Sequence, residues 1–110
     1  VNEPLITALL SAKRGWWNER ATDDRSFVRA LDNVATCAVE GMRIVRERRS
    51  DAIFLQSEAC EAFAPADPVE AGHVAYARHL NGLRFVAFDQ TRQLSGLGQE
   101  LHPAFASLDL

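Results

Sequence analysis

The sequence predicts an α/β fold, arranged as one strand–helix–strand–helix segment that covers residues 1–110. Two stretches of the chain predict it. In residues 25–49, apolar side chains recur at three- and four-residue steps, which is typical of an amphipathic helix. After a short turn, residues 52–56 form an apolar run without alternation, which is typical of a strand covered on both faces. A long helix that leads through a turn into such a strand is half of a βαβ unit.

The segment before the long helix is mixed in character. Apolar residues from Leu5 to Leu10 predict a short helical turn, and a long loop follows. Asp23 and Asp24 are placed to cap the long helix or to supply negative charge to its first turn. Because a βαβ unit needs a strand before this loop, we expect that strand to end at Val1 and the chain to open inside a fold.

The long helix and the strand are expected to share a hydrophobic core. One face of the helix is apolar, and its glycine would let it approach a strand closely. The expected contacts join Leu31, Val34, Ala38 and Val45 of the helix to Ile53 and Leu55 of the strand.

A second helix is predicted from the stretch Asp67-Pro68-Val69-Glu70. Aspartate can cap a helix, proline suits the first helical position, and Glu70 occupies the capping-box position. Asn81-Gly82 interrupts the helical pattern and is expected to break or kink this helix. Residues 83–88 could alternatively form a strand.

Composition and charge exclude several classes of function. The formal net charge of −3 gives no support to nucleic-acid binding, and the basic residues from Arg43 to Arg49 lie where they complement a helix dipole. No stretch approaches the roughly 18 consecutive apolar residues of a membrane span. The two cysteines form neither a disulfide scaffold nor a zinc motif. We therefore expect a cytoplasmic protein with no cofactor or metal, no nucleic acid and no membrane among its partners.

The tripeptide Asn2-Glu3-Pro4 carries a resemblance to a known family. It resembles the motif that follows the fourth barrel strand in glycoside hydrolase family 1, the β-glucosidase and 6-phospho-β-glucosidase group. The order of the following elements, and the stretch from Asn81 to Asp89 with His102-Pro103 behind it, are similar to that family as well. The resemblance implies that residues 1–110 are a segment of a (β/α)8 TIM barrel, which as a whole needs about 250 residues.

The resemblance also implies chemical roles. Glu3 matches the general acid/base, and Asn2 matches the residue that hydrogen-bonds the sugar 2-hydroxyl. A retaining glycosidase needs a second carboxylate as nucleophile, about 5–5.5 Å from the first. In this family the nucleophile belongs to a Glu-Asn-Gly motif, which the chain lacks. We therefore expect a fragment or truncated relative of such a glycosidase that is inactive on its own.

Four further residues are candidates for contact with a carbohydrate substrate. Ser57 and Glu58 follow the predicted strand, where the active-site rim of a barrel would lie. Trp16 and Trp17 could stack on the apolar faces of sugars. The plainer alternatives are that Glu58 is a solvated loop carboxylate and that a tryptophan anchors its loop to the fold.

Two other functions stay open at this point. The chain could be a small helix-rich interaction module, or a non-catalytic barrel domain with a sugar-binding or scaffolding role. A barrel segment would also leave the edges of its strands unpaired, and unpaired edges promote association. We accordingly expect self-association through such edges.

Overall fold

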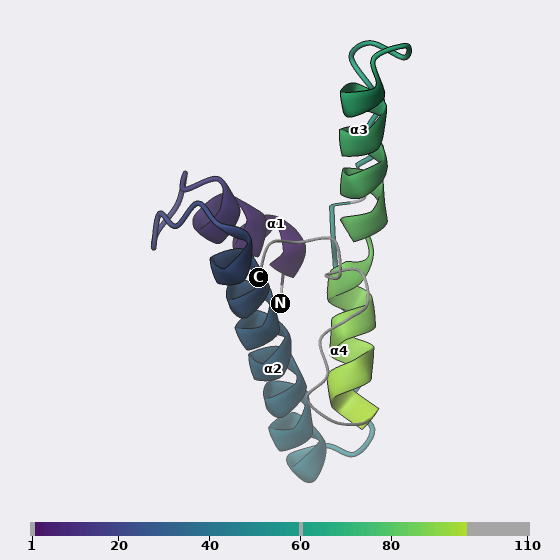
Figure 1. Ribbon diagram of the computed structural model, residues 1–110. Helices are drawn as coiled ribbons and strands as arrows, with labels where there is room; N and C mark the ends of the chain where they lie inside the picture. Colours follow the sequence, from purple (N-terminus) through teal and green to yellow (C-terminus); the bar gives the residue numbers. More distant parts are fainter. Residues whose placement is uncertain (1, 60, 97–110) are drawn as a thin grey trace.

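The computed structural model describes residues 2–59 and 61–96, which form a series of helices (Figure 1). Helix α1 covers Pro4–Ala8 and continues into η1, a π-helical turn at Leu9–Lys13. A loop leads to α2, the longest helix, at Asp24–Arg48. An extended segment then connects α2 to α3 at Ala71–Leu83, and α4 follows at Val86–Gly96.

The predicted α/β fold is wrong, and so is the TIM-barrel segment. Every named element in residues 2–59 and 61–96 is a helix, and their β-type pairing is one isolated parallel bridge between Asn2 and Ser57. The strand predicted at residues 52–56 is therefore absent: these residues form neither a helix nor a strand, and no described residues lie beside them as a second strand. A strand is defined by its hydrogen-bonded neighbour, which a local apolar pattern does not supply. The strand end predicted at Val1 lies outside the described residues.

The prediction of one long helix over residues 25–49 is confirmed within one residue at each end. Its N-cap is Asp23, whose Oδ1 accepts a hydrogen bond from the backbone N–H of Ser26 at 2.8 Å. This bond satisfies one of the N–H groups that the first turn leaves without a helical partner. The buried face of the helix is formed by Phe27, Val28, Leu31, Ala35 and Val39.

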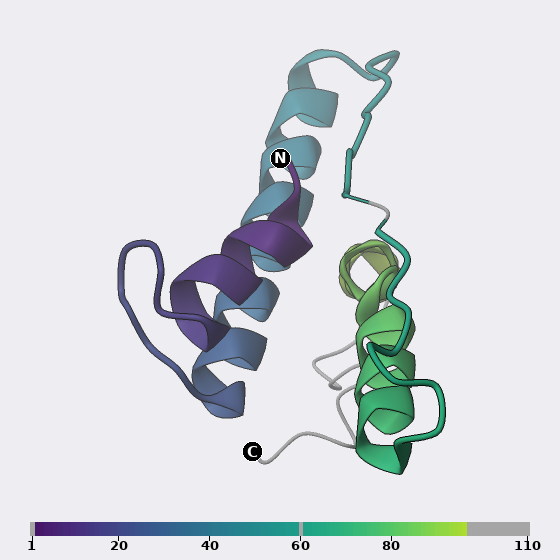
Figure 2. The same cartoon turned by 90° about the horizontal axis from the view of Figure 1, so that it is seen from above.

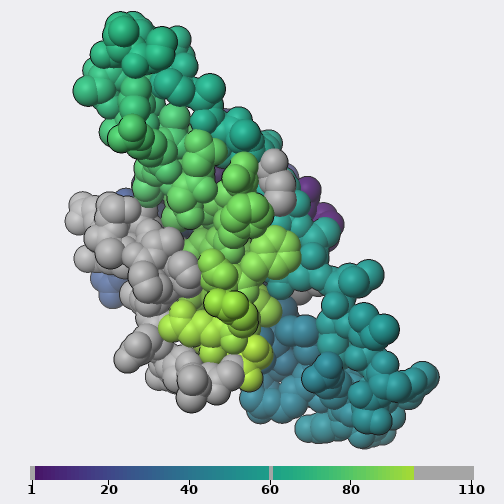
Figure 3. All heavy atoms as spheres, turned by 90° about the vertical axis from the view of Figure 1, so that its right-hand side faces the viewer, coloured from purple at the N-terminus to yellow at the C-terminus, as the bar shows by residue number. Residues whose placement is uncertain are grey.

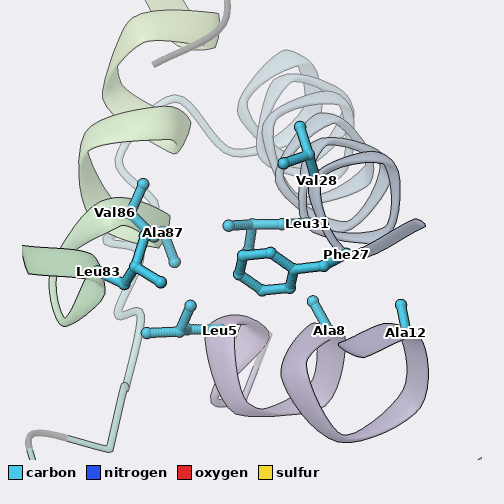
Figure 4. Packing of buried hydrophobic residues seen from close by; sticks show 9 residues of the cluster. All are labelled: Leu5, Ala8, Ala12, Phe27, Val28, Leu31, Leu83, Val86 and Ala87. Atoms are coloured by element: carbon cyan, nitrogen blue, oxygen red, sulfur yellow. The ribbon is translucent and has the colours of Figure 1, made fainter. Parts of the chain in front are cut away.

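The core lies where α1 and η1, α2 and the α3–α4 corner meet (Figure 4). Phe27 is 1% exposed and Leu31 is completely buried. Burying side chains of this size stabilises the fold by roughly 1.5–3 kcal/mol each. The cluster consists of Leu5, Ala8, Ala12, Phe27, Val28, Leu31, Leu83, Val86 and Ala87.

The predicted packing of the long helix against residues 52–56 is also wrong. Ile53 is 87% exposed and Leu55 is 90% exposed, while Val45 on α2 is 44% exposed. The buried face of α2 packs instead against α1, η1 and α4. Because these helices already cover that face, it has no room for a strand.

The second predicted helix is present but begins later than expected. It starts at Ala71, and Glu70 caps it by accepting a hydrogen bond from the N–H of His73 at 2.7 Å. The expected interruption is found just beyond Asn81-Gly82, since α3 ends at Leu83 and α4 begins at Val86. The alternative strand over residues 83–88 is therefore wrong.

Candidate functional site

The candidate site is built where the start of α1 meets the end of the extended segment. The backbone N–H of Glu3 donates to the carbonyl of Ser57 at 2.8 Å. The hydroxyl of Ser57 donates to Oδ1 of Asn2, also at 2.8 Å, across 55 positions of sequence. Together with Glu58, these residues form what we call the Asn2–Glu58 cluster: Asn2, Glu3, Ser57 and Glu58.

The carboxylate of Glu58 joins the cluster to α1. It accepts hydrogen bonds from the backbone N–H of Leu5 at 3.2 Å to Oε1 and 3.3 Å to Oε2. That N–H belongs to the first turn of α1, where the helix itself provides no acceptor. The contact therefore anchors the half-buried side chain of Glu58 to the start of a helix.

The surroundings raise the pKa of the Glu58 carboxyl above its ordinary value. Burial is the largest cause, because it disfavours the charged form. The hydrogen bonds from the backbone N–H of Leu5 lower the pKa, and the negative charge of Glu3 raises it again. The balance leaves Glu58 protonated to a higher pH than an isolated glutamate.

Glu3 has a strained backbone. Its φ is +46° and its ψ is 57°, in the left-handed region that residues other than glycine seldom adopt. Such a conformation costs on the order of 1–3 kcal/mol and is found disproportionately at functional sites. Here it lets the chain turn from the bridge at Asn2 directly into α1 at Pro4.

Four of the six residues predicted for the site are thus brought together, and the two tryptophans are not. Trp16 and Trp17 are 68% and 50% exposed, and they lie in the loop after η1. Ten helical residues, spanning roughly 15 Å, separate this loop from the cluster; Figure 2 shows the loop and the N-terminus at opposite ends of this helical stretch. Neither tryptophan is buried as an anchor. The guanidinium of Arg14 lies 5.8 Å from the centre of the Trp16 ring.

Sequence reasoning missed the backbone N–H of Leu5 as part of this site. No residue pattern indicates it, because Leu5 and Glu58 lie 53 positions apart in the sequence and meet only in the folded chain. In the part of the chain that the structure describes, no three His, Cys, Asp or Glu side chains gather as a metal site. No helix among the described residues combines the length and apolar character needed to cross a membrane.

Comparison with known proteins adds no relative. The chain matches no family model. Neither the curated proteins nor the solved structures contain a significant match to it.

Proposed function

We propose that the Asn2–Glu58 cluster binds a glycoside and supplies the acid/base carboxyl of a retaining glycosidase. The observation that carries the proposal is the bridge between Asn2 and Ser57, which sets Glu3 and Glu58 at one site from distant parts of the chain. An acid/base carboxyl is one of the two carboxyl groups that hydrolysis of an O-glycosidic bond requires.

The chemistry of the pair supports this role. Protonating a leaving oxygen requires a carboxyl that keeps its proton at a pH where ordinary glutamates have lost it. The raised pKa of Glu58 gives the cluster a carboxyl of this kind. The acid/base role of Glu3 itself is supported only by its resemblance to the family's motif. Asn2 and Ser57 are exposed beside them and carry groups that can hydrogen-bond sugar hydroxyls.

The chain has no Glu-Asn-Gly motif to provide the nucleophile. An acid without a nucleophile cannot complete a double displacement. The 110-residue chain is therefore expected to bind a sugar without hydrolysing it, and binding is the property to measure.

A protonated iminosugar, 1-deoxynojirimycin, is a suitable probe because its charge resembles that of the oxocarbenium-like transition state. Titration followed by NMR shifts should show saturable binding that Glu3→Gln weakens about tenfold, equivalent to roughly 1.4 kcal/mol. Glu61→Gln, which removes a nearby exposed carboxylate, should leave the affinity unchanged. Piperidinium, which has the charge but no hydroxyls, should bind far more weakly.

Two results would contradict the proposal. One is the absence of saturable iminosugar binding to the intact chain. The other is an equal loss of affinity in Glu3→Gln and Glu61→Gln, which would mean that only the overall charge matters. Turnover of an aryl glycoside by the chain alone would show that a nucleophile is present after all.

A small interaction module is a second candidate function, favoured by a separate observation. Ile53 and Leu55 are almost fully exposed, and Ile44 on α2 is 62% exposed. Exposed large apolar side chains are candidates for protein contact sites. Association through them should be unaffected by Glu3→Gln, so the two candidate functions can be tested in the same samples.

A further inference from the structure

A cavity of about 190 Å³, which we call the α3 cavity, lies between η1, the first turn of α2 and one side of α3. None of the residues of the Asn2–Glu58 cluster lines it. Figure 3 shows α3 projecting from the rest of the molecule at the upper left. The cavity is smaller than the roughly 300–1,000 Å³ of pockets for drug-sized ligands, so its size suits a ligand with a single ring.

One part of the lining is apolar and belongs partly to the hydrophobic core. It consists of Leu9, Phe27, Leu80 and Leu83. Phe27 is 1% exposed, and Figure 4 shows its ring directed from α2 toward Leu83. Because the core holds these two side chains, this part of the cavity is formed before any ligand arrives. An apolar ring placed against it would be removed from water, which favours binding.

The other part of the lining is polar and comes from both walls. Lys13 and Arg14 lie on one wall, and Tyr76 and His79 lie three positions apart on one face of α3. The guanidinium of Arg14 donates from Nη2 to the hydroxyl oxygen of Tyr76 at 3.3 Å and so joins the two walls. Because that oxygen accepts in this contact, the O–H of Tyr76 is still available as a donor, and the imidazole of His79 offers an N–H.

The charges of the lining favour an anion. Lys13 forms an ion pair with Asp24, which also lines the cavity. Arg14 contacts two uncharged groups instead: the hydroxyl of Tyr76 and the ring of Trp16, whose centre is 5.8 Å from the guanidinium carbon. The lining therefore has two cations against one anion, although the whole chain has a net charge of −3. A guanidinium can bind a carboxylate through two parallel N–H groups.

We propose that the α3 cavity binds a small aromatic carboxylate. The ring lies against the apolar lining, and the carboxylate accepts hydrogen bonds from Arg14, Tyr76 and His79. An apolar pocket with a few converging polar groups is typical of small-molecule sites. The contact with Trp16 helps to hold the guanidinium of Arg14 in place. This site is separate from the Asn2–Glu58 cluster and does not depend on the function proposed for it.

Titration of the full chain with phenylacetate, followed by NMR shifts, tests the proposal. Binding should saturate, and the largest shifts should fall at residues 13–14 and 76–83. Phenylacetamide has nearly the same shape without the charge, and acetate has the charge without the ring. Each should bind at least about tenfold more weakly, because each lacks one of the two features that the cavity recognises.

Substitutions identify the groups that bind the carboxylate. Arg14→Gln should weaken phenylacetate binding about tenfold or more, because it removes a charge-assisted pair of hydrogen bonds. Tyr76→Phe should weaken it by a smaller factor, since it removes one donor and keeps the ring. Arg29→Gln is the matched control, because it removes the same charge from an exposed position of α2 outside the cavity. Neither Arg29→Gln nor Glu3→Gln should change the affinity, and circular dichroism checks that all four variants keep their helices.

The proposal is overturned if phenylacetate shows no saturable binding, or if phenylacetamide binds as tightly. It is equally overturned if Arg14→Gln and Arg29→Gln lose the same affinity, or if the shifts fall only outside the lining of the cavity. Weaker binding in Arg14→Gln and Tyr76→Phe, together with unchanged binding in Arg29→Gln and shifts at residues 76–83, establishes it.

Discussion

The α2 core and the extended segment at residues 52–57 are both apolar, yet only the first is buried. On α2, Phe27 and Leu31 pack against α1, η1 and the α3–α4 corner. In the extended segment, Ile53 and Leu55 project into solvent. An apolar pattern thus indicates which side chains need a partner, whereas the packing of the whole fold decides which element provides it.

The largest difference in stability should come from truncating a large apolar side chain to alanine, once in the core and once in the extended segment. Phe27→Ala should lower the free energy of unfolding by about 3–5 kcal/mol, because it leaves a cavity in the core. Leu55→Ala should change it by less than about 0.5 kcal/mol, because an exposed side chain leaves none. Urea unfolding at a concentration where the chain is monomeric measures both. Equal losses would mean that Leu55 is buried in solution.

A polar contact between α2 and α4 should have the next largest effect. Gln90 is buried at 1% exposure and donates through Nε2 to Oδ1 of Asp32 at 2.9 Å. Its Oε1 is buried without a hydrogen bond to any described residue. Asp32→Ala would leave Nε2 unpaired as well, at a cost of about 1–3 kcal/mol.

Asp32→Asn is the control for that contact, because its side-chain oxygen can still accept the hydrogen bond. Thermal unfolding should therefore show a smaller loss for asparagine than for alanine. If alanine is as stable as asparagine at this position, the helices are held together by apolar packing alone.

The strained turn at Glu3 should produce a smaller effect of opposite sign. Glycine adopts the left-handed conformation without the steric cost that an L-residue meets, which is roughly 1–2 kcal/mol. Part of that gain is offset by the greater freedom of glycine when unfolded, so Glu3→Gly should stabilise the chain by up to about 1 kcal/mol. Glu3→Ala removes the same carboxylate but keeps the strain, and it should bring no such gain. Chemical denaturation of the two variants separates strain from charge.

The smallest effect concerns the pH dependence of stability. The pKa of Glu58 is higher in the folded chain than its ordinary value of 4.5. The stabilisation of the fold by Glu58 is therefore fully present below pH 4.5, and it is lost as the pH rises through the folded pKa. Glu58→Gln stays neutral and keeps an acceptor for the N–H of Leu5. Unfolding measured from pH 4.5 upward should show a decline in the parent chain that is weaker in Glu58→Gln.

Asp23 provides the comparison of opposite sign. The hydrogen bonds from Ser26 lower its pKa, so it stabilises the fold above its ordinary value of 3.8, and this stabilisation is lost as the pH falls through the lower folded value. Asp23→Asn keeps a side chain that can cap the helix. It should therefore reduce only the loss of stability at acid pH. If Glu58→Gln instead changed the loss of stability at acid pH, the assignment of that loss to Asp23 would be contradicted.

Much of the helical structure could be predicted from sequence. The apolar period and the cap at Asp23 predict α2 within one residue at each end, because both signals are local to the chain. The break near Asn81-Gly82 is predicted for the same reason. The sequence predicts a start of α3 that is too early, because Asp67 and Glu70 both resemble caps and only the folded chain shows that Glu70 is used.

The sequence predicts Asn2, Glu3, Ser57 and Glu58 as site residues, and it predicts that they lie on one rim of a barrel, which the described residues do not form. A single bridge joins them instead, and the raised pKa of Glu58 depends on burial and on Leu5, which no local pattern encodes.

The sequence by itself determined the helices and the residues that need burial, because helical hydrogen bonds and caps join residues three or four positions apart. Tertiary structure alone decided that α1 and α4, not residues 52–56, cover the apolar face of α2. It also decided that Glu58 meets the start of α1. These outcomes depend on contacts between residues far apart in the sequence, where competing elements pack against the same surface and the most favourable total packing prevails.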